Sequence, residues 1–228
     1  MRYSGVGNSP GKVHHWIVWN ENNSQAWFDL SPYIPHTNSR NITGTNISPS
    51  HLTLWQDRMA DMMKATHRAI QKTTSGVLIH MSLTSNWLVA DPADPFPHVA
   101  GKTMLDGLWA RLGTQYEWSV ALHTYGDAGR APIFTADPLG TDPAFSTMVS
   151  QRAVVDYQIS QLYNRAPANY LYHSPKEYPW PILFNSEQGW QQQIGVSRMA
   201  EFICKSYHAV EDHMGGNTII GITHNLFQ

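Results

Sequence analysis

The segment "HHWIVWNENN", residues 14–23, decides the fold expected for this chain, because an apolar run of strand length ends abruptly at Asn20. Similar apolar runs recur later in the sequence, as "GVLIHMSL" (76–83), "EWSVALH" (117–123), "PILFNSE" (181–187) and "TIIGITH" (218–224). Each run is nearly continuous rather than alternating, which is typical of strands buried on both faces of a sheet.

Amphipathic helical patterns lie between these runs. The segment 48–73 places apolar side chains at spacings of three and four, and Ser48 followed by Pro49 is a plausible helix start. The segment 101–113 repeats the pattern with Met104, Leu105, Leu108, Trp109 and Leu112, and Gly113 can end that helix. Segments 146–165 and 196–212 supply two more amphipathic stretches. The alternation of strands and helices predicts a parallel α/β sheet, and residues 1–228 are interpreted as a single domain.

Composition narrows the class of protein. The chain has 228 residues, of which 42% are hydrophobic and 14% charged, with a formal net charge of -2. These values favour neither disorder nor a polyanionic partner, so nucleic acid is not expected. No apolar run approaches the roughly 20 residues of a membrane helix, and residues 1–13 lack the apolar region of a signal peptide. The single Cys204 cannot form an internal disulfide and is expected to be a buried core thiol.

Polar residues follow every predicted strand. They are Asn20-Glu21-Asn22, the segment 82–87 that ends in Trp87, His123-Thr124-Tyr125, the segment 186–190 that contains Glu187, and His224-Asn225. The loops at the carboxyl ends of parallel strands converge, so functional groups are expected there. Glu21 and Glu187 each follow an apolar strand directly. A retaining glycosidase needs two such carboxyl groups about 5 Å apart; the alternative is that each glutamate is a helix-capping or loop carboxylate.

Other catalytic signatures are missing from the sequence. The segment "GVGNSPGK" (5–12) lacks the final Ser/Thr and the preceding strand of a phosphate-binding loop, and no G-x-S-x-G motif of a serine hydrolase occurs. His14 and His15 would point to opposite faces of a strand, and His208 and His213 do not share the i, i+4 spacing of paired ligands. No metal or cofactor is therefore predicted.

The motifs "WIVWNEN" and "ILFNSEQGW" resemble the fourth-strand Asn-Glu and the seventh-strand Glu of the clan-A glycoside hydrolases, which are cellulase-like (β/α)8 barrels. "ALHTY" is similar to the His-x-Tyr of the sixth strand in that clan. The combination also resembles an uncharacterised bacterial group of cellulase-like barrels that is carried as a domain of unknown function. The resemblance covers roughly residues 13–228.

The resemblance implies roles for individual residues. Glu21 would be the acid/base and Glu187 the nucleophile, while Asn20 would bind the 2-hydroxyl of the sugar. His123 and Tyr125 would orient Glu187 or touch the sugar. Further expected substrate contacts are Trp27, Trp87 and Trp190, which could stack on sugar rings or equally belong to the core, together with Asn22 and His224. Trp16 and Trp19 are expected to be packing residues, and Trp19 occupies a position where the family commonly has a small residue.

The expected fold is therefore an incomplete (β/α)8 barrel that contains strands 4 to 8 with their helices and lacks strands 1 to 3. Such a chain would be part of a longer protein or would associate through exposed sheet edges beside "HHWIVW" and "TIIGITH". The expected function is retaining hydrolysis of a β-glycosidic bond in an oligo- or polysaccharide. The alternative is a non-catalytic carbohydrate-binding or scaffold remnant. Location stays open, and would be extracellular or periplasmic if a longer precursor carries a signal peptide.

Overall fold

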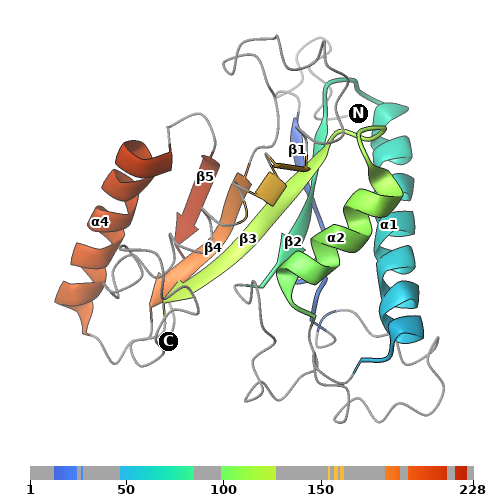
Figure 1. The fold of residues 1–228 in the computed structure, drawn as a ribbon. Coiled ribbons are helices and arrows are strands. Elements are labelled where there is room, and N and C mark those ends of the chain that lie inside the picture. The colour runs from blue at the N-terminus through green and yellow to red at the C-terminus, as the bar shows by residue number, and fades with distance from the viewer. Residues whose placement is uncertain are drawn as a thin grey trace.

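The computed structural model describes residues 13–24, 27, 47–84, 99–126, 154, 157, 158, 160, 161, 183–190, 195–214 and 219–224. The strands are β1 (His15–Val18), β2 (Leu78–Leu83), β3 (Trp118–Gly126), β4 (Leu183–Trp190) and β5 (Ile219–His224), and the helices are α1 (Pro49–Gln71), α2 (Gly101–Leu112) and α4 (Val196–Met214) (Figure 1). Each predicted strand segment overlaps one of these strands, and β3 and β4 each continue three residues beyond the predicted end. The helical patterns of segments 48–73, 101–113 and 196–212 are confirmed, and within segment 146–165 the described residues are helical.

The strands form a five-stranded sheet with the order β1-β2-β3-β4-β5, and every neighbouring pair is parallel. They run from the top to the bottom of Figure 1, so their carboxyl ends share the lower edge. The predicted (β/α)8 barrel is wrong. In the described part of the chain the sheet is open, because β1 and β5 are its two edges and do not pair with each other, and it belongs to a small α/β fold. The expected association through these edges stays a prediction.

The ends of the first two helices follow the local sequence. Ser48 is the N-cap of α1, where its hydroxyl oxygen accepts a hydrogen bond from the backbone N–H of His51 at 3.3 Å, and Pro49 begins the helix. At the end of α2, Gly113 has a φ of 52°, in the left-handed region that favours glycine. Both predicted helix boundaries are confirmed.

One face of the sheet packs against α1 and α2. In β2, the alternate residues Ile79, Met81 and Leu83 belong to a buried apolar cluster. Helix α1 contributes Trp55, Met59 and Met63 to this cluster, and α2 contributes the five residues predicted from its sequence, namely Met104, Leu105, Leu108, Trp109 and Leu112. All five are at most 1% exposed, so the predicted core face of α2 is confirmed.

The other face of the sheet is polar although it is buried. His80 and Ser82 of β2 alternate with the apolar residues and are 0% exposed, and His123 of β3 is 2% exposed. Buried polar groups are costly unless they are hydrogen-bonded to one another or to the backbone. The polar network described below therefore depends on this face of the sheet.

Three side chains differ from their expected environments. Trp16 in β1 and Trp19 directly after it, expected to be packing residues, are 41% and 61% exposed, and among the described strands β1 has a neighbour on one side only. Cys204, expected in the core, is exposed on α4.

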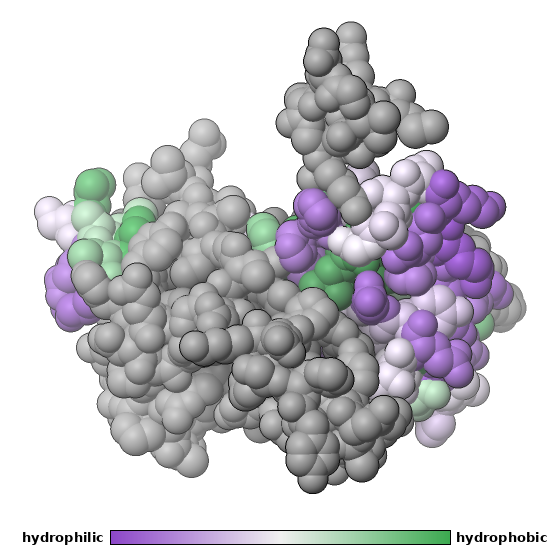
Figure 2. Space-filling model, turned by 90° about the horizontal axis from the view of Figure 1, so that it is seen from above, coloured by the Kyte–Doolittle hydropathy of each residue, from purple (hydrophilic) through white to green (hydrophobic). Residues whose placement is uncertain are grey.

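The described surface above α1 and α2 is mainly hydrophilic, as the right-hand part of Figure 2 shows. No helix among the described residues is long and apolar enough to cross a membrane.

Candidate functional site

The chain turns sharply where β1 ends. Trp19 has a φ of 68° and Glu21 a φ of 40°, so two residues with side chains adopt the left-handed conformation on either side of Asn20. Each such residue costs about 1–3 kcal/mol, and strain of this kind concentrates at functional sites. The backbone of this turn is held by the two asparagines that follow it.

Asn22 joins the turn to the sheet and to α1. Its backbone N–H donates to the carbonyl oxygen of Ser82 at 2.8 Å, and its side-chain Oδ1 accepts from the backbone N–H of Ser82 at 3.1 Å. Its own carbonyl oxygen accepts from the indole Nε1 of Trp55 at 2.9 Å. Asn22 was expected to contact the substrate. It is 0% exposed, so it lies below the surface and holds the turn in place.

Asn23, the next residue, also joins the turn to other segments of the chain by hydrogen bonds. Its Nδ2 donates to Thr84 Oγ1 at 3.0 Å and to the carbonyl oxygen of Val99 at 2.8 Å, and its Oδ1 accepts from the backbone N–H of Thr84 at 2.9 Å. Its carbonyl oxygen accepts from the backbone N–H of Val99 at 2.8 Å. This asparagine therefore ties together the turn after β1, the end of β2 and the residues that lead into α2.

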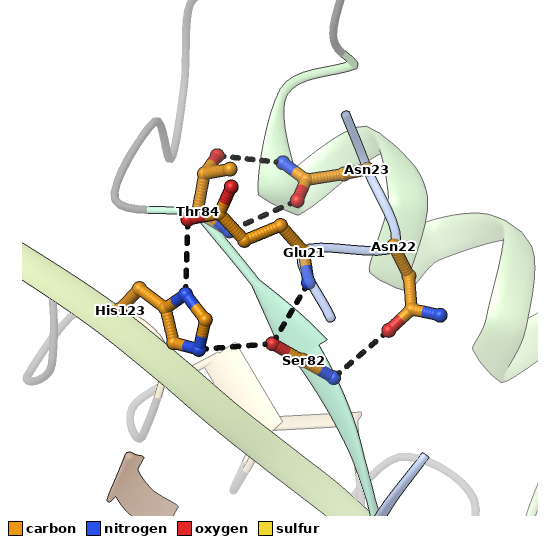
Figure 3. A network of polar contacts seen from close by, with 6 residues as sticks. All are labelled: Glu21, Asn22, Asn23, Ser82, Thr84 and His123. Carbon is orange, nitrogen blue, oxygen red and sulfur yellow. Dashed lines mark hydrogen bonds and ion pairs between the residues drawn. The ribbon is translucent and has the colours of Figure 1, made fainter. Parts of the chain in front are cut away.

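Glu21, in the turn after β1, lies at the end of a polar chain that includes His123 of β3 and Ser82 of β2 (Figure 3). Its Oε1 is 2.9 Å from Nδ1 of His123, and Nε2 of His123 is 3.2 Å from Oγ of Ser82. Ser82 Oγ also accepts the backbone N–H of Glu21 at 3.0 Å. The Glu21 side chain is 19% exposed whereas that of His123 is 3% exposed, so the carboxyl group is the member of this chain that reaches the surface.

The acceptor-only chemistry of an ionised carboxylate fixes the hydrogens of this chain. The N–H on Nδ1 of His123 donates to Oε1 of Glu21, and Nε2 is an acceptor in the tautomer that carries its single hydrogen on Nδ1. The hydroxyl of Ser82 then donates to Nε2. The contact of the Glu21 carboxyl group with His123 is made by Oε1, and within the described part of the chain Oε2 makes no hydrogen bond.

A serine, a histidine and a glutamate in this order also resemble the triad of a serine hydrolase. Such an enzyme needs an accessible serine, whereas Ser82 is 0% exposed and accepts the backbone N–H of Glu21. Ser82 is therefore suited to holding the imidazole of His123 rather than to attacking a substrate.

The pairing of β3 with β4 places the backbone of Glu187 next to this polar chain. Its backbone in β4 is paired with that of His123 in β3, directly after an irregularity between Leu122 and His123. The side chain of Glu187 lies outside the described part of the structure. The register nevertheless places the second predicted carboxylate on the strand next to the histidine that holds the first.

The remaining predicted residues divide into three groups. Trp27 is 53% exposed, and Asn20 is partly buried in the turn. Tyr125, Trp190 and His224 lie in β3, β4 and β5, where Tyr125 pairs with Gly189 and His224 with Gln188, but their side chains are outside the described structure. Trp87 lies wholly outside the described residues.

A second histidine lies further back on the polar face. Burial and the neighbouring His15 lower the pKa of His80 to about 3, so this imidazole is neutral at physiological pH. Its Nε2 is 3.1 Å from Nδ1 of His15. No group of three His, Cys, Asp or Glu side chains that could hold a metal ion occurs among the residues that the structure describes.

Ser82 and Asn23 were not assigned a role from the sequence, although both are central to the site. Ser82 stands among the polar residues that end the second strand, and that position is the one local signal that could have marked it. Asn23 follows the Asn20-Glu21-Asn22 motif, and nothing in the local pattern shows that its amide binds segments far along the chain.

The chain was also compared with known proteins. No protein-family model, curated protein or solved structure matches it.

Proposed function

We propose that this chain is a glycoside hydrolase that cleaves a β-glycosidic bond with retention of configuration, with Glu21 as acid/base and Glu187 as nucleophile. One observation carries the proposal. A partly exposed carboxyl group, that of Glu21, is fixed by a buried imidazole, and the backbone of that same histidine is paired with Glu187 on the next strand. Retaining glycosidases use a pair of carboxyl groups about 5 Å apart.

The register supports this separation. Adjacent strands lie about 4.8 Å apart, so Glu187 starts one strand spacing from His123. The carboxyl group of Glu21 extends from the turn after β1 to His123 and contacts its Nδ1 at 2.9 Å. β1 and β4 are separated by two strands, and the turn after β1, which is hydrogen-bonded to Ser82 of β2, together with the side chain of Glu21 brings the carboxyl group to His123 of β3.

The proposed reaction proceeds by two displacements. Glu187 attacks the anomeric carbon and forms a covalent glycosyl-enzyme, while Glu21 gives its proton to the glycosidic oxygen of the leaving group. Glu21 then takes a proton from a water molecule, which attacks the anomeric carbon and releases Glu187. The product sugar keeps its original configuration because the carbon has been inverted twice.

The buried network has a defined part in this cycle. His123 holds Oε1 of Glu21 through Nδ1, and Ser82 holds the imidazole through Nε2. The proton is exchanged at Oε2, so the carboxyl group keeps its position in both steps. General acid–base catalysis requires such a fixed position within hydrogen-bonding distance of the reacting oxygen.

A non-catalytic carbohydrate-binding protein is the second candidate. The exposed side chains of Trp19 and Trp27, close to Glu21 in sequence, favour it, since exposed aromatic rings can bind sugars without turnover. The strained turn and the buried Glu21–His123–Ser82 chain favour the enzyme, because a binding surface does not require a fixed carboxyl group.

The test uses covalent trapping. The protein is incubated with 2,4-dinitrophenyl 2-deoxy-2-fluoro-β-glycosides of glucose, mannose, galactose and xylose, and the labelled peptide is mapped by mass spectrometry. We expect one sugar on Glu187, no label in Glu187→Gln, and normal labelling in the control Glu201→Gln. Glu201 is a suitable control because it forms an exposed ion pair with Lys205 on α4. A label on another carboxylate refutes the roles, and the absence of labelling and turnover with every sugar refutes the enzyme.

A further inference from the structure

A pair of histidines connects the edge strand β1 to β2 on the polar face of the sheet. Nδ1 of His15 lies 3.1 Å from Nε2 of His80, and the centroids of the two rings are 5.4 Å apart. The backbone of His15 is paired with that of Leu78, whose side chain lies on the same face as that of His80 two residues later. The pair lies at the amino end of β1, whereas Glu21 follows the carboxyl end of that strand, so it is separate from the candidate catalytic site.

The two imidazoles differ in their surroundings. His80 is 0% exposed, and the ring of Phe184 in β4 packs against it with 5.9 Å between the ring centroids. His15 is exposed, since among the described strands β1 has a neighbour on one side only. Close packing fixes the orientation of a buried ring, whereas an exposed side chain can rotate. The pair therefore combines one fixed nitrogen with one that can adjust its position.

Both imidazoles are neutral at physiological pH. Burial, followed by the neighbouring His15, lowers the pKa of His80 to about 3. Burial and the neighbouring His14 also lower the pKa of His15 below its ordinary value. Metal ions bind the neutral form of histidine through a nitrogen lone pair. Neither ring of this pair has to lose its charge before it can act as a ligand.

The single hydrogen on each neutral ring can be placed so that both facing nitrogens are free. Nδ1 of His80 has no hydrogen-bond partner of normal geometry among the described residues, but the backbone of Val120 is near enough to raise the pKa of this ring as an acceptor. A hydrogen on Nδ1 leaves the lone pair of Nε2 directed at His15. On the exposed His15, a hydrogen on Nε2 can donate to water and leaves the lone pair of Nδ1 directed at His80.

We propose that His15 and His80 together bind one divalent transition-metal ion of the zinc class, which joins the edge strand β1 to β2. Imidazole nitrogen is a suitable ligand for Zn²⁺, Cu²⁺ and Ni²⁺. Two nitrogens bound to a tetrahedral ion at about 2.0–2.1 Å are about 3.3–3.4 Å apart, so the pair has to open by only roughly 0.3 Å from its separation of 3.1 Å. A small rotation of the exposed His15 side chain provides this opening.

Two protein ligands define the kind of site. Among the described residues no third group joins the pair: the ring nitrogens of His123 contact Glu21 and Ser82, and Nδ1 of His14 lies 3.2 Å from the carbonyl oxygen of Gly76. Water fills the remaining coordination positions of the ion. The site is therefore weaker than a structural zinc centre with four protein ligands, and its effect is to stabilise the edge strand.

The local sequence pattern does not show this pair. His14 and His15 alternate between the two faces of a strand, which argued against a metal site within that segment. His15 and His80 are 65 positions apart along the chain, and the pairing of β1 with β2 brings them together.

The test uses the untagged, metal-free full chain, titrated with ZnCl2 by calorimetry and followed in thermal unfolding, with MgCl2 as the control ion. We expect the wild type to bind one more Zn²⁺ than His15→Ala does, or to bind it at least about tenfold more tightly. Zn²⁺ but not Mg²⁺ should raise the unfolding temperature of the wild type, because an ion that binds only the folded chain stabilises it. His15→Ala should lose this shift.

His14→Ala is the matched control, because His14 is the adjacent exposed histidine and does not face His80. This variant should keep both the binding and the shift. His15 is exposed, so His15→Ala should unfold in the absence of metal as cooperatively as the wild type, which separates loss of a ligand from loss of the fold. His80→Gln, if folded, should lose the shift as His15→Ala does.

A spectroscopic measurement identifies the ligands directly. With one equivalent of Cu²⁺, the electron paramagnetic resonance spectrum of the wild type should show coupling to imidazole nitrogens that is reduced in His15→Ala and unchanged in His14→Ala. Equal binding and equal shifts in the wild type and His15→Ala would indicate an adventitious ion only and would overturn the proposal. Absence of Zn²⁺ binding, or equal losses in His14→Ala and His15→Ala, would also overturn it. None of these outcomes depends on the roles of Glu21 and Glu187.

Discussion

Nδ1 of His123 lies 2.9 Å from Oε1 of Glu21, although 102 positions separate the two residues along the chain. The imidazole is buried and the carboxyl group is partly exposed, so the histidine supports the glutamate from below. The family resemblance suggested that His123 would orient Glu187 or touch the sugar. The described contacts place it against Glu21, while Glu187 is its backbone neighbour on the next strand.

Replacing His123 should affect substrates according to their leaving groups. We expect His123→Ala to lower kcat/KM by roughly 10²-fold for glycosides with poor leaving groups, because a mobile Glu21 cannot protonate the departing oxygen efficiently. Dinitrophenyl glycosides need little protonation and should lose far less in the first step. Measuring kcat/KM over a series of aryl glycosides tests this, and a loss that is independent of the leaving group would contradict the positioning role.

Removing the carboxyl group of Glu21 should leave the first step on activated substrates and slow the second. In Glu21→Ala, the glycosyl-enzyme formed from a dinitrophenyl glycoside should accumulate as an initial burst of dinitrophenol. Added azide should restore turnover and yield a β-glycosyl azide, because a small anion attacks without a general base. Glu187→Gln should show neither burst nor rescue. Identical behaviour of the two variants would contradict the roles assigned to Glu21 and Glu187.

Acid should destabilise the fold through His80. The pKa of this residue is about 3 in the folded protein and about 6.5 in an unfolded chain, so the unfolded state binds more protons between these values. The resulting loss in the free energy of unfolding is absent above about pH 6.5 and grows by up to about 1.4 kcal/mol for each pH unit below it. Urea unfolding of the wild type and of His80→Gln between pH 7.5 and 4.5 measures this difference. Parallel pH curves for the two proteins would show that His80 is not responsible.

Asn23 should contribute strongly to stability. In Asn23→Ala, the backbone N–H of Thr84 and the carbonyl oxygen of Val99 lose buried partners, and each unpaired group costs about 1–3 kcal/mol. We expect a total loss of roughly 2–5 kcal/mol in the free energy of unfolding, measured by urea denaturation. Lys102→Ala is the control, since its ion pair with Asp106 is exposed and should matter little. A loss no larger than that of the control would remove Asn23 from its anchoring role.

The close contact of α1 and α2 at Gly107 gives a further prediction. A Cβ atom at this position would lie 2.0 Å from Cδ of Gln56, whose amide also donates to the carbonyl oxygen of Thr103 and accepts from Arg111. Gly107→Ala should therefore destabilise the protein by roughly 1–3 kcal/mol. Adding Gln56→Ala should recover part of this loss, because it removes the clashing group. Purely additive effects in thermal or urea unfolding would rule out a direct clash.

The sequence by itself determined the secondary structure and much of the helical packing. The five strand segments, the Ser48 cap, the Gly113 end and the core face of α2 follow from local periods and from residues that act on their immediate neighbours. The sequence also indicated that Glu21 follows a strand end, because the polar residues begin where the apolar run stops.

Tertiary structure decided the closure of the sheet and the partners in the site. A repeated strand–helix pattern is the same in an open sheet and in a barrel, so the predicted barrel could not be distinguished from the open sheet, in which β1 and β5 remain edges. The register beside His123, the burial of Ser82 and the left-handed backbone of Trp19 and Glu21 depend on strands that are distant in sequence. Local periodicity carries no information about such contacts, because they are fixed only when the neighbouring strands pair and their side chains compete for the same buried space.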